Sequence, residues 1–433
     1  MTLMGSPSDW LAIGVLCATP RRGSSFRQLI RRFSEGRSLL VMVVTGGKDR
    51  LLVLRASLTL AVAMGLGRFA FTPILPLMVG QTGLTAESAA TLATANYLGY
   101  LVGAVAAIFA HWIPRSRAAL RVSLVLLIAT LALMPAAESM SLWLTLRFLA
   151  GVASAVLFVF TARVAHQQVT GGGDGVGWVF GGIGAGIALS GCALLALGSG
   201  GSWRVSWLVV AALAAVLALF AWSLPGGDHA TATSAGRQSP VSRRDRRRFA
   251  WLMAAYFCEG IGYIVSATFI VAAVASIGTA TWLGSAVWIA VGLAGLPSCV
   301  LWIRLSRRHS RVAMLAVAFA VQIVGVGASA LFDATAVQLL AALAFGGTFM
   351  GIVMLTLAEG TELVGPRAPA IGTALYGLGQ VLGPLMVAPL LDTGYSRSLA
   401  VAAGVLVLGL AFLVPLLRSA RAEVPESEQV VAR

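Results

Sequence analysis

The chain has 433 residues, of which 58% are hydrophobic and only 11% are charged, and its formal net charge at pH 7 is +15. This composition excludes an ordinary soluble domain and predicts a protein that crosses a membrane many times. A hydrocarbon core of about 30 Å needs roughly 20 apolar residues per helix. In chain order, the predicted spans are Leu51–Val79, Ser88–Trp112, Ala118–Ala136, Leu142–His166, Val176–Gly198, Trp203–Leu224, Phe249–Ala275, Trp282–Ile303, Val312–Leu331, Ala334–Ala358, Pro369–Leu391 and Ser398–Leu417. The predicted fold class is an all-α polytopic membrane protein with twelve transmembrane helices.

The basic residues lie mostly on alternate connections between these spans. If the N-terminus is cytoplasmic, 27 of the 31 lysines and arginines fall on the cytoplasmic side. Arg68 and Arg147 lie within spans, and only Arg204 and Arg397 fall outside. This is the positive-inside pattern of membrane proteins, so the basic excess requires no nucleic-acid partner. It predicts a multi-pass membrane protein, surrounded by lipid, with both termini in the cytoplasm.

The longest polar connection divides the spans into six and six. Residues 225–248 are rich in Gly, Ser, Thr and Arg, as a cytoplasmic linker would be. We therefore expect an N-terminal bundle at 51–224, a C-terminal bundle at 249–418 and a cytoplasmic tail at 419–433. Residues 1–50 differ in character from the rest. They are either a mis-assigned start, with Met42 as the true initiator, or a basic segment on the inner leaflet, and we favour the first.

Short glycine motifs recur in the two halves at nearly one offset. Gly65 and Gly67 have counterparts 195 residues later at Gly260 and Gly262, and Gly182 and Gly186 have counterparts 197 residues later at Gly379 and Gly383. Two matches at similar offsets, with the linker between them, indicate a parallel repeat. Such repeats suit a transporter whose substrate site lies near the membrane midplane between its halves.

Five stretches carry a family resemblance. They are Gly65–Met78 in the first span, Asn96–Gly103 in the second, Arg147–Ala155 in the fourth, Gly177–Gly186 in the fifth and Gly379–Pro384 in the eleventh. Over roughly residues 51–418 the chain resembles the major facilitator superfamily, and within it the bacterial YbfB/YjiJ-like branch. The resemblance implies a monomeric transporter of two six-helix bundles in a bacterial inner membrane, and it does not supply a substrate.

The resemblance also has departures and structural implications. Ile187 stands where many members carry proline, and the loop His111–Arg117 lacks the aspartate to which a gating contact between the halves is usually assigned. The matching stretches contain residues that we expect to serve helix packing or gating. These are Gly65, Gly67, Pro73, Pro76, Gly182, Gly186, Gly379, Gly383 and Pro384.

Two ionisable residues lie deep within spans at equivalent places in the two halves. Arg68 lies about 20 Å along the first helix from Arg55, and Glu259 lies about 16 Å along the seventh from Arg248. Arg68 is predicted to hold an anionic substrate group, and Glu259 to carry the coupling proton. The alternative is that the two side chains simply neutralise each other.

Further polar and aromatic residues complete the predicted substrate or coupling site. The resemblance implicates Arg147 in coupling, although it could instead bind backbone carbonyls or lipid headgroups. Asn96 and Tyr100 lie on one face of the second span and either contact substrate or join helices. Gln380 has the same two readings, and Tyr263 is either an aromatic wall of the cavity or a packing residue.

Other function classes find little support. The sequence has no P-loop for an ATP-driven pump, no clustered histidines or carboxylates for an enzyme, and no cysteine spacing for a metal. A sensor would need an output domain larger than the tail after Arg418. The prediction is a secondary active transporter without a cofactor, taking a small organic solute, possibly an anion, and coupled to protons. Proton-driven efflux of drugs or cations is the alternative.

Overall fold

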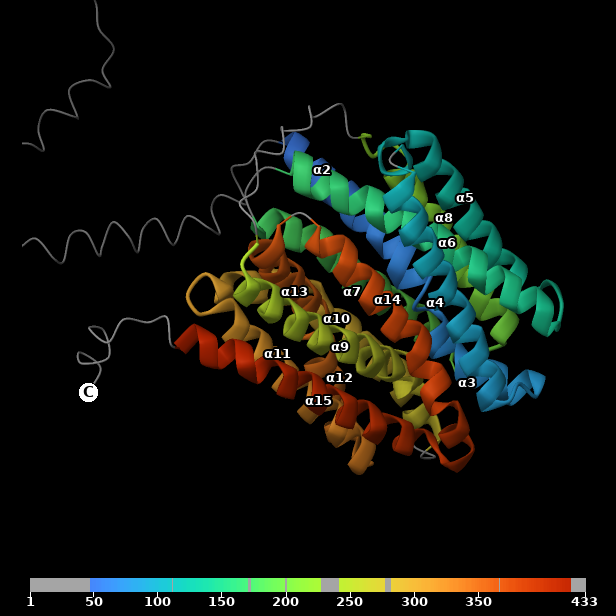
Figure 1. Ribbon diagram of the computed structural model, residues 1–433. Helices are drawn as coiled ribbons and strands as arrows, with labels where there is room; N and C mark the ends of the chain where they lie inside the picture. The colour runs from blue at the N-terminus through green and yellow to red at the C-terminus, as the bar shows by residue number, and fades with distance from the viewer. Residues whose placement is uncertain are drawn as a thin grey trace, which may run out of the picture. The chain divides into compact units, whose positions relative to one another are not determined.

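The computed structural model describes residues 47–110, 112–169, 173–198, 201–226, 241–276, 282–365 and 367–421, and this part of the chain is entirely helical (Figure 1). Contacts along the chain separate the unit Met1–Arg50 from a second compact unit, Leu51–Arg433. Most of the predicted N-terminal extension, the middle of the linker and the end of the tail lie outside the described residues.

Among the described residues, twelve helical stretches are long and apolar enough to cross a membrane, which confirms the predicted fold class. The first span combines three elements, and the third, tenth and eleventh combine two each. In chain order the elements are α2 (Gly47–Leu60), the π-helix η1 (Ala61–Leu66), α3 (Phe71–Thr82), α4 (Ala86–Phe109), η2 (Ile113–Arg115), α5 (Arg117–Leu133), η3 (Met134–Ala136), α6 (Met140–Gln168), α7 (Gly173–Leu197), α8 (Trp203–Ala221), α9 (Arg243–Ser276), α10 (Leu283–Ser306), α11 (Arg311–Leu331), α12 (Thr335–Gly346), α13 (Phe349–Val364), α14 (Ala368–Val387), η4 (Ala388–Thr393) and α15 (Tyr395–Arg421).

The seventh span begins earlier than hydropathy indicates. The predicted start was Phe249, at the end of the polar linker, but α9 begins at Arg243. Ser242 Oγ accepts a hydrogen bond from the Asp245 N–H at 3.0 Å, as an N-terminal cap does. Arginine also favours helix, so the basic run continues the span instead of ending it.

Small residues allow several helices to approach closely. A Cβ atom on Gly65 would overlap the backbone of Gly186, which packs η1 against α7. Gly182 lies against the carbonyl of Ser57 in the same way. In the other half, a Cβ on Gly379 would lie 2.7 Å from the carbonyl oxygen of Phe257 on α9. Six of the eight repeated glycines thus occupy close contacts between the first and fifth spans or between the seventh and eleventh, whereas Gly67 faces α5 and Gly262 faces α15.

The first and seventh spans meet at equivalent depths. The Thr72 hydroxyl donates to the carbonyl oxygen of Ala267 at 2.6 Å, and these two residues are separated by 195 positions, the offset of the glycine repeat. One residue further along α9, the hydroxyls of Thr268 and Tyr97 are 2.7 Å apart. These bonds join the two halves of the repeat beside the predicted site.

Two spans are interrupted near their middle. In the first, η1 has π-type hydrogen bonds, with the Gly67 N–H donating to the Val62 carbonyl at 2.8 Å. Pro73 has no N–H to offer the Phe69 carbonyl, and α3 begins only at Phe71. In the tenth, Gly347 and Thr348 separate α12 from α13. Interruptions of this kind leave backbone groups free for other partners.

Candidate functional site

Arg68 lies in the interruption of the first span and faces the other half of the protein. Its side chain is 2% exposed, and Nη2 donates to Gln380 Oε1 on α14 at 2.6 Å. The guanidinium carbon lies 4.2 Å from the ring centroid of Tyr100 and 4.8 Å from that of Tyr97, both on α4. Two predicted site residues from opposite halves are therefore in direct contact, on a platform of tyrosine rings.

Arg147 on α6 supports this interruption. The Thr72 N–H bonds the Phe69 carbonyl, so the helix does not use the carbonyl of Arg68. Arg147 Nη2 donates to that carbonyl oxygen at 3.3 Å. Asn96 Nδ2 in turn donates to the Arg147 carbonyl at 2.8 Å, tying α4 to α6. The structure thus places Arg147 where it holds the backbone of Arg68, and places Asn96 in an interhelical hydrogen bond.

The two arginines lack anionic partners within the described residues. The ion pairs of that part of the chain involve other arginines, Arg204, Arg248, Arg304, Arg307 and Arg311. Arg68 Nε and Arg147 Nε and Nη1 are buried without a hydrogen-bond acceptor. Arg147 is 1% exposed, with its guanidinium 4.7 Å from the ring centroid of Phe71. A buried charge without a partner is costly. The arrangement therefore favours an anion as the missing acceptor.

Glu259 on α9 has a neutral partner instead of a cation. It is fully buried, and its Oε1 accepts from Gln322 Nε2 on α11 at 2.9 Å, while Oε2 has no hydrogen-bond partner. Since Arg68 binds Gln380, the structure does not show the alternative in which Arg68 and Glu259 neutralise each other. Gln322 was absent from the predicted site, because a single glutamine in an apolar span carries no motif.

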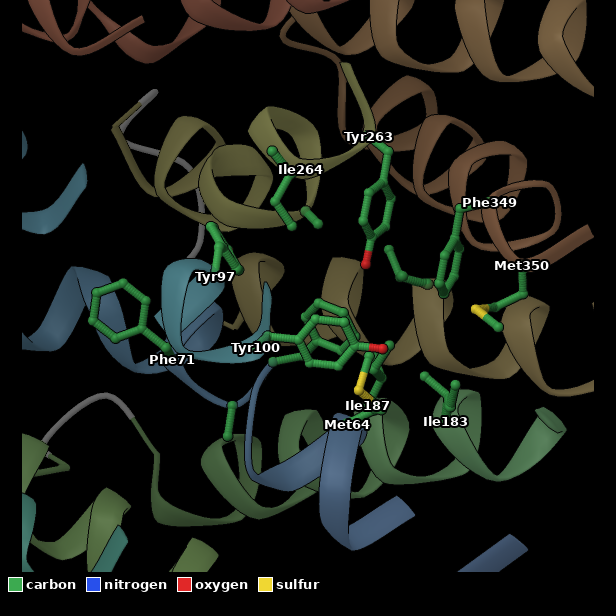
Figure 2. Packing of buried hydrophobic residues seen from close by; sticks show 14 of the residues in the cluster. Met64, Phe71, Tyr97, Tyr100, Ile183, Ile187, Tyr263, Ile264, Phe349 and Met350 are labelled. Atoms are coloured by element: carbon green, nitrogen blue, oxygen red, sulfur yellow. The ribbon is translucent and has the colours of Figure 1, made fainter. Parts of the chain in front are cut away.

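A row of aromatic rings lines the C-terminal half beside these residues. Tyr263 stacks on Phe349 with centroids 5.3 Å apart and on Tyr376 at 5.8 Å. Tyr376 stacks on Tyr256 at 4.4 Å. Figure 2 shows Tyr263 and Phe349 side by side, both pointing toward Tyr100 from the other half. Tyr263 thus lies in a stacked row next to the tyrosine platform of Arg68.

Ion pairs join the two halves between the start of α7 and the arginine-rich end of α10. Asp174 lies 3.1 Å from Arg304 Nε and 3.0 Å from Arg307 Nη2. Asp174 lies at the start of the fifth span, whereas the aspartate missing from the loop His111–Arg117 would have followed the second. The halves therefore have an ionic contact here that the superfamily pattern did not predict.

Comparisons with known proteins agree with this architecture. A sequence family described as "Uncharacterised MFS-type transporter YbfB" matches residues 60–414. Among solved structures, the chain is similar to a crystal structure of the nucleoside transporter NupG carrying an aspartate-to-alanine mutation. The TM-score is 0.61 at 15% identity, with 84% of this chain and 99% of that chain covered. At that identity the likeness concerns the fold alone. No curated protein matches the chain in sequence.

Proposed function

The chain belongs to the family of MFS-type transporters that includes YbfB and is a secondary transporter. We propose that it transports a small organic anion and that this transport is coupled to the movement of protons. The observation that carries the anion is the pair of buried guanidinium groups of Arg68 and Arg147, with three donor atoms lacking acceptors. A carboxylate offers about four acceptor sites and matches the donor fork of arginine.

Binding of the anion would compete with a contact between the halves. Arg68 reaches Gln380 across the halves, so an anion that takes the Arg68 guanidinium frees Gln380. Such an exchange couples substrate occupancy to the contact between α14 and the first span. Alternating access then follows if the two conformations differ in which partner Arg68 has.

Glu259 is proposed as the proton site. It is a carboxyl in mid-span with one neutral hydrogen-bond partner. In such surroundings a carboxyl group either takes up a proton or, when ionised, requires a cation or water beside it. Proton uptake here would neutralise the C-terminal half at the step when the anion neutralises the N-terminal half.

Proton-driven efflux of cations is the second candidate. It is favoured by the row of Tyr256, Tyr376 and Tyr263 near Glu259, because aromatic faces and a carboxylate together bind organic cations. The buried arginines oppose it, since they would repel a cation nearby.

The oligomeric state, the membrane and the orientation of the transporter are proposed from its sequence pattern. We propose a monomer in a bacterial inner membrane with both termini cytoplasmic, and a division into bundles at 51–224 and 249–418. The alternation of basic connections supports the orientation, and the glycine repeat supports the division.

The test is substrate-dependent proton flux in proteoliposomes, with a panel of carboxylates and lipophilic cations. For an anion transporter, we expect flux with a carboxylate that is lost in both Arg68→Gln and Glu259→Gln. Flux with cations that survives Arg68→Gln would replace the anion proposal by efflux. Anion flux without proton movement would overturn the proton step alone.

A further inference from the structure

Glu259 is the first member of a buried hydrogen-bond chain that ends at the interruption of the tenth span. Gln322 donates to Glu259 and its Oε1 accepts from Thr348 Oγ1 at 3.1 Å. All three side chains are at most 2% exposed. Thr348 is one of the two residues that separate α12 from α13. The chain therefore connects a mid-span carboxyl with a helix break.

The repeat indicates that the fold does not require these polar groups. Shifting Glu259 and Gln322 back by 195 positions gives Met64 in η1 and Leu127 in α5. Both are apolar and buried, and Leu127 packs near the same segment through Gly67. The N-terminal half thus fills the equivalent space with hydrocarbon, so the polar chain of the C-terminal half has a role beyond packing.

The Thr348 hydroxyl has more acceptors than it can use at once. Besides Gln322 Oε1, the carbonyl of Ala344 lies 2.7 Å away and that of Phe345 lies 3.1 Å away. A hydroxyl has one proton to donate. Thr348 therefore donates either to the α11 side chain or to the end of α12, and these are two alternative orientations of its hydroxyl proton.

We propose that Gln322 is a positioning residue that links the protonation of Glu259 to the break at Thr348; the proposal rests on Glu259 as the proton site. An ionised Glu259 only accepts, so Gln322 must turn its NH₂ toward the carboxylate and its carbonyl toward Thr348. A protonated Glu259 can donate to the Gln322 carbonyl. The amide then reverses, presents NH₂ to Thr348, and turns the hydroxyl toward α12.

Two hydrogen bonds anchor the backbone of the helix break to α10. The Gly347 carbonyl accepts from Ser298 Oγ at 2.9 Å and from Trp302 Nε1 at 2.7 Å, both on α10. The backbone at the break is therefore held to α10 while the Thr348 side chain changes partner. A change of hydrogen bonding at Thr348 would alter the angle between α12 and α13 about this anchor.

The other titratable groups near Glu259 are neutral side chains of the same region. Tyr256, Cys258 and Tyr263 on α9 and Tyr376 on α14 are close enough to interact with it electrostatically. The charged residues of the remaining helices packed on α9 lie at helix ends: Arg304 on α10, Arg311 on α11, Glu359 and Glu362 on α13, and Arg397, Arg418 and Arg421 on α15. Among the described residues, the polar chain is thus the direct hydrogen-bonded link from Glu259 to a helix break.

The test combines two readouts on the full chain in nanodiscs without added substrate. Infrared difference spectra between pH 5 and pH 9 report protonation of Glu259 through the carboxyl C=O band that Glu259→Gln removes. Spin labels on the exposed positions Leu340 of α12 and Thr361 of α13 report the angle across the break. Cys192, which is exposed, and Cys17 are replaced by serine, so that the labels react with cysteines introduced at the two chosen positions.

We expect the distance between the labels to change with pH in the wild type and to become independent of pH in Glu259→Gln and in Gln322→Leu. Glu259 should still titrate in Gln322→Leu. Gln338→Leu is the matched control, because Gln338 is a buried glutamine that bonds Ser329 and not Glu259, and it should behave as the wild type. A pH-dependent distance that survives Gln322→Leu would overturn the link. An infrared band that does not titrate would instead overturn Glu259 as the proton site.

Discussion

Replacing Gln380 by leucine tests whether substrate competes with the contact between the halves. The change removes the acceptor 2.6 Å from Arg68 Nη2, in a place where both side chains are 2% exposed. A hydrogen bond to a charged group contributes about 1.5–3 kcal/mol. If the anion must displace this bond, its loss returns that free energy to binding, so the Kd should fall by about 10- to 100-fold.

The assay is calorimetric titration, in nanodiscs, of the carboxylate that gives the strongest proton flux in proteoliposomes. Gln380→Glu is the matched variant, because it places a carboxylate beside Arg68 and should weaken binding of the anion. If Gln380→Leu bound the anion tenfold more weakly instead, Gln380 would be a substrate ligand and the competition described here would be wrong.

Three further changes probe the rest of the site. Glu259→Gln should abolish proton-driven uptake while leaving exchange of labelled for unlabelled anion intact, and loss of exchange as well would argue against a role limited to the proton. Arg147→Met removes two of the three buried donor atoms that lack acceptors and should raise the Kd of the anion by about 10-fold or more. An unchanged Kd in the calorimetric titration would show that Arg147 does not bind the anion. Gly65→Val would force η1 away from α7 and should cost about 3 kcal/mol or more, whereas Gly80→Val, at a position with no neighbouring atoms, should leave thermal stability close to that of the wild type.

Hydropathy and arginine placement were sufficient to predict the number of spans, because both reflect the cost of moving side chains into the bilayer. Pro73 was predicted only to serve helix packing or gating, and the interruption of the first span beside it became visible in the structure, as did the break at Gly347 and Thr348, which contains no proline. Depth along a helix correctly indicated Arg68 and Glu259 as buried charges.

Their partners could not be predicted from depth. A helix position fixes how far a side chain lies across the membrane but not which neighbour it faces, since rotation about the helix axis depends on packing. Arg68 therefore met Gln380, 312 residues away, and Glu259 met Gln322 on a span that carried no motif. The roles of these residues in transport stay predictions.

The ion pairs of Asp174 with Arg304 and Arg307 bear on how fast the transporter can turn over. The arginine side chains are 45% and 53% exposed, so water and salt screen them, and each pair contributes about 0.2–1 kcal/mol. An ion pair of that strength changes the equilibrium constant between two conformations by a factor of about five at most. The halves are thus held at this end firmly enough to favour one arrangement and weakly enough that thermal motion releases them, and the ionic strength of the adjoining solution tunes the balance.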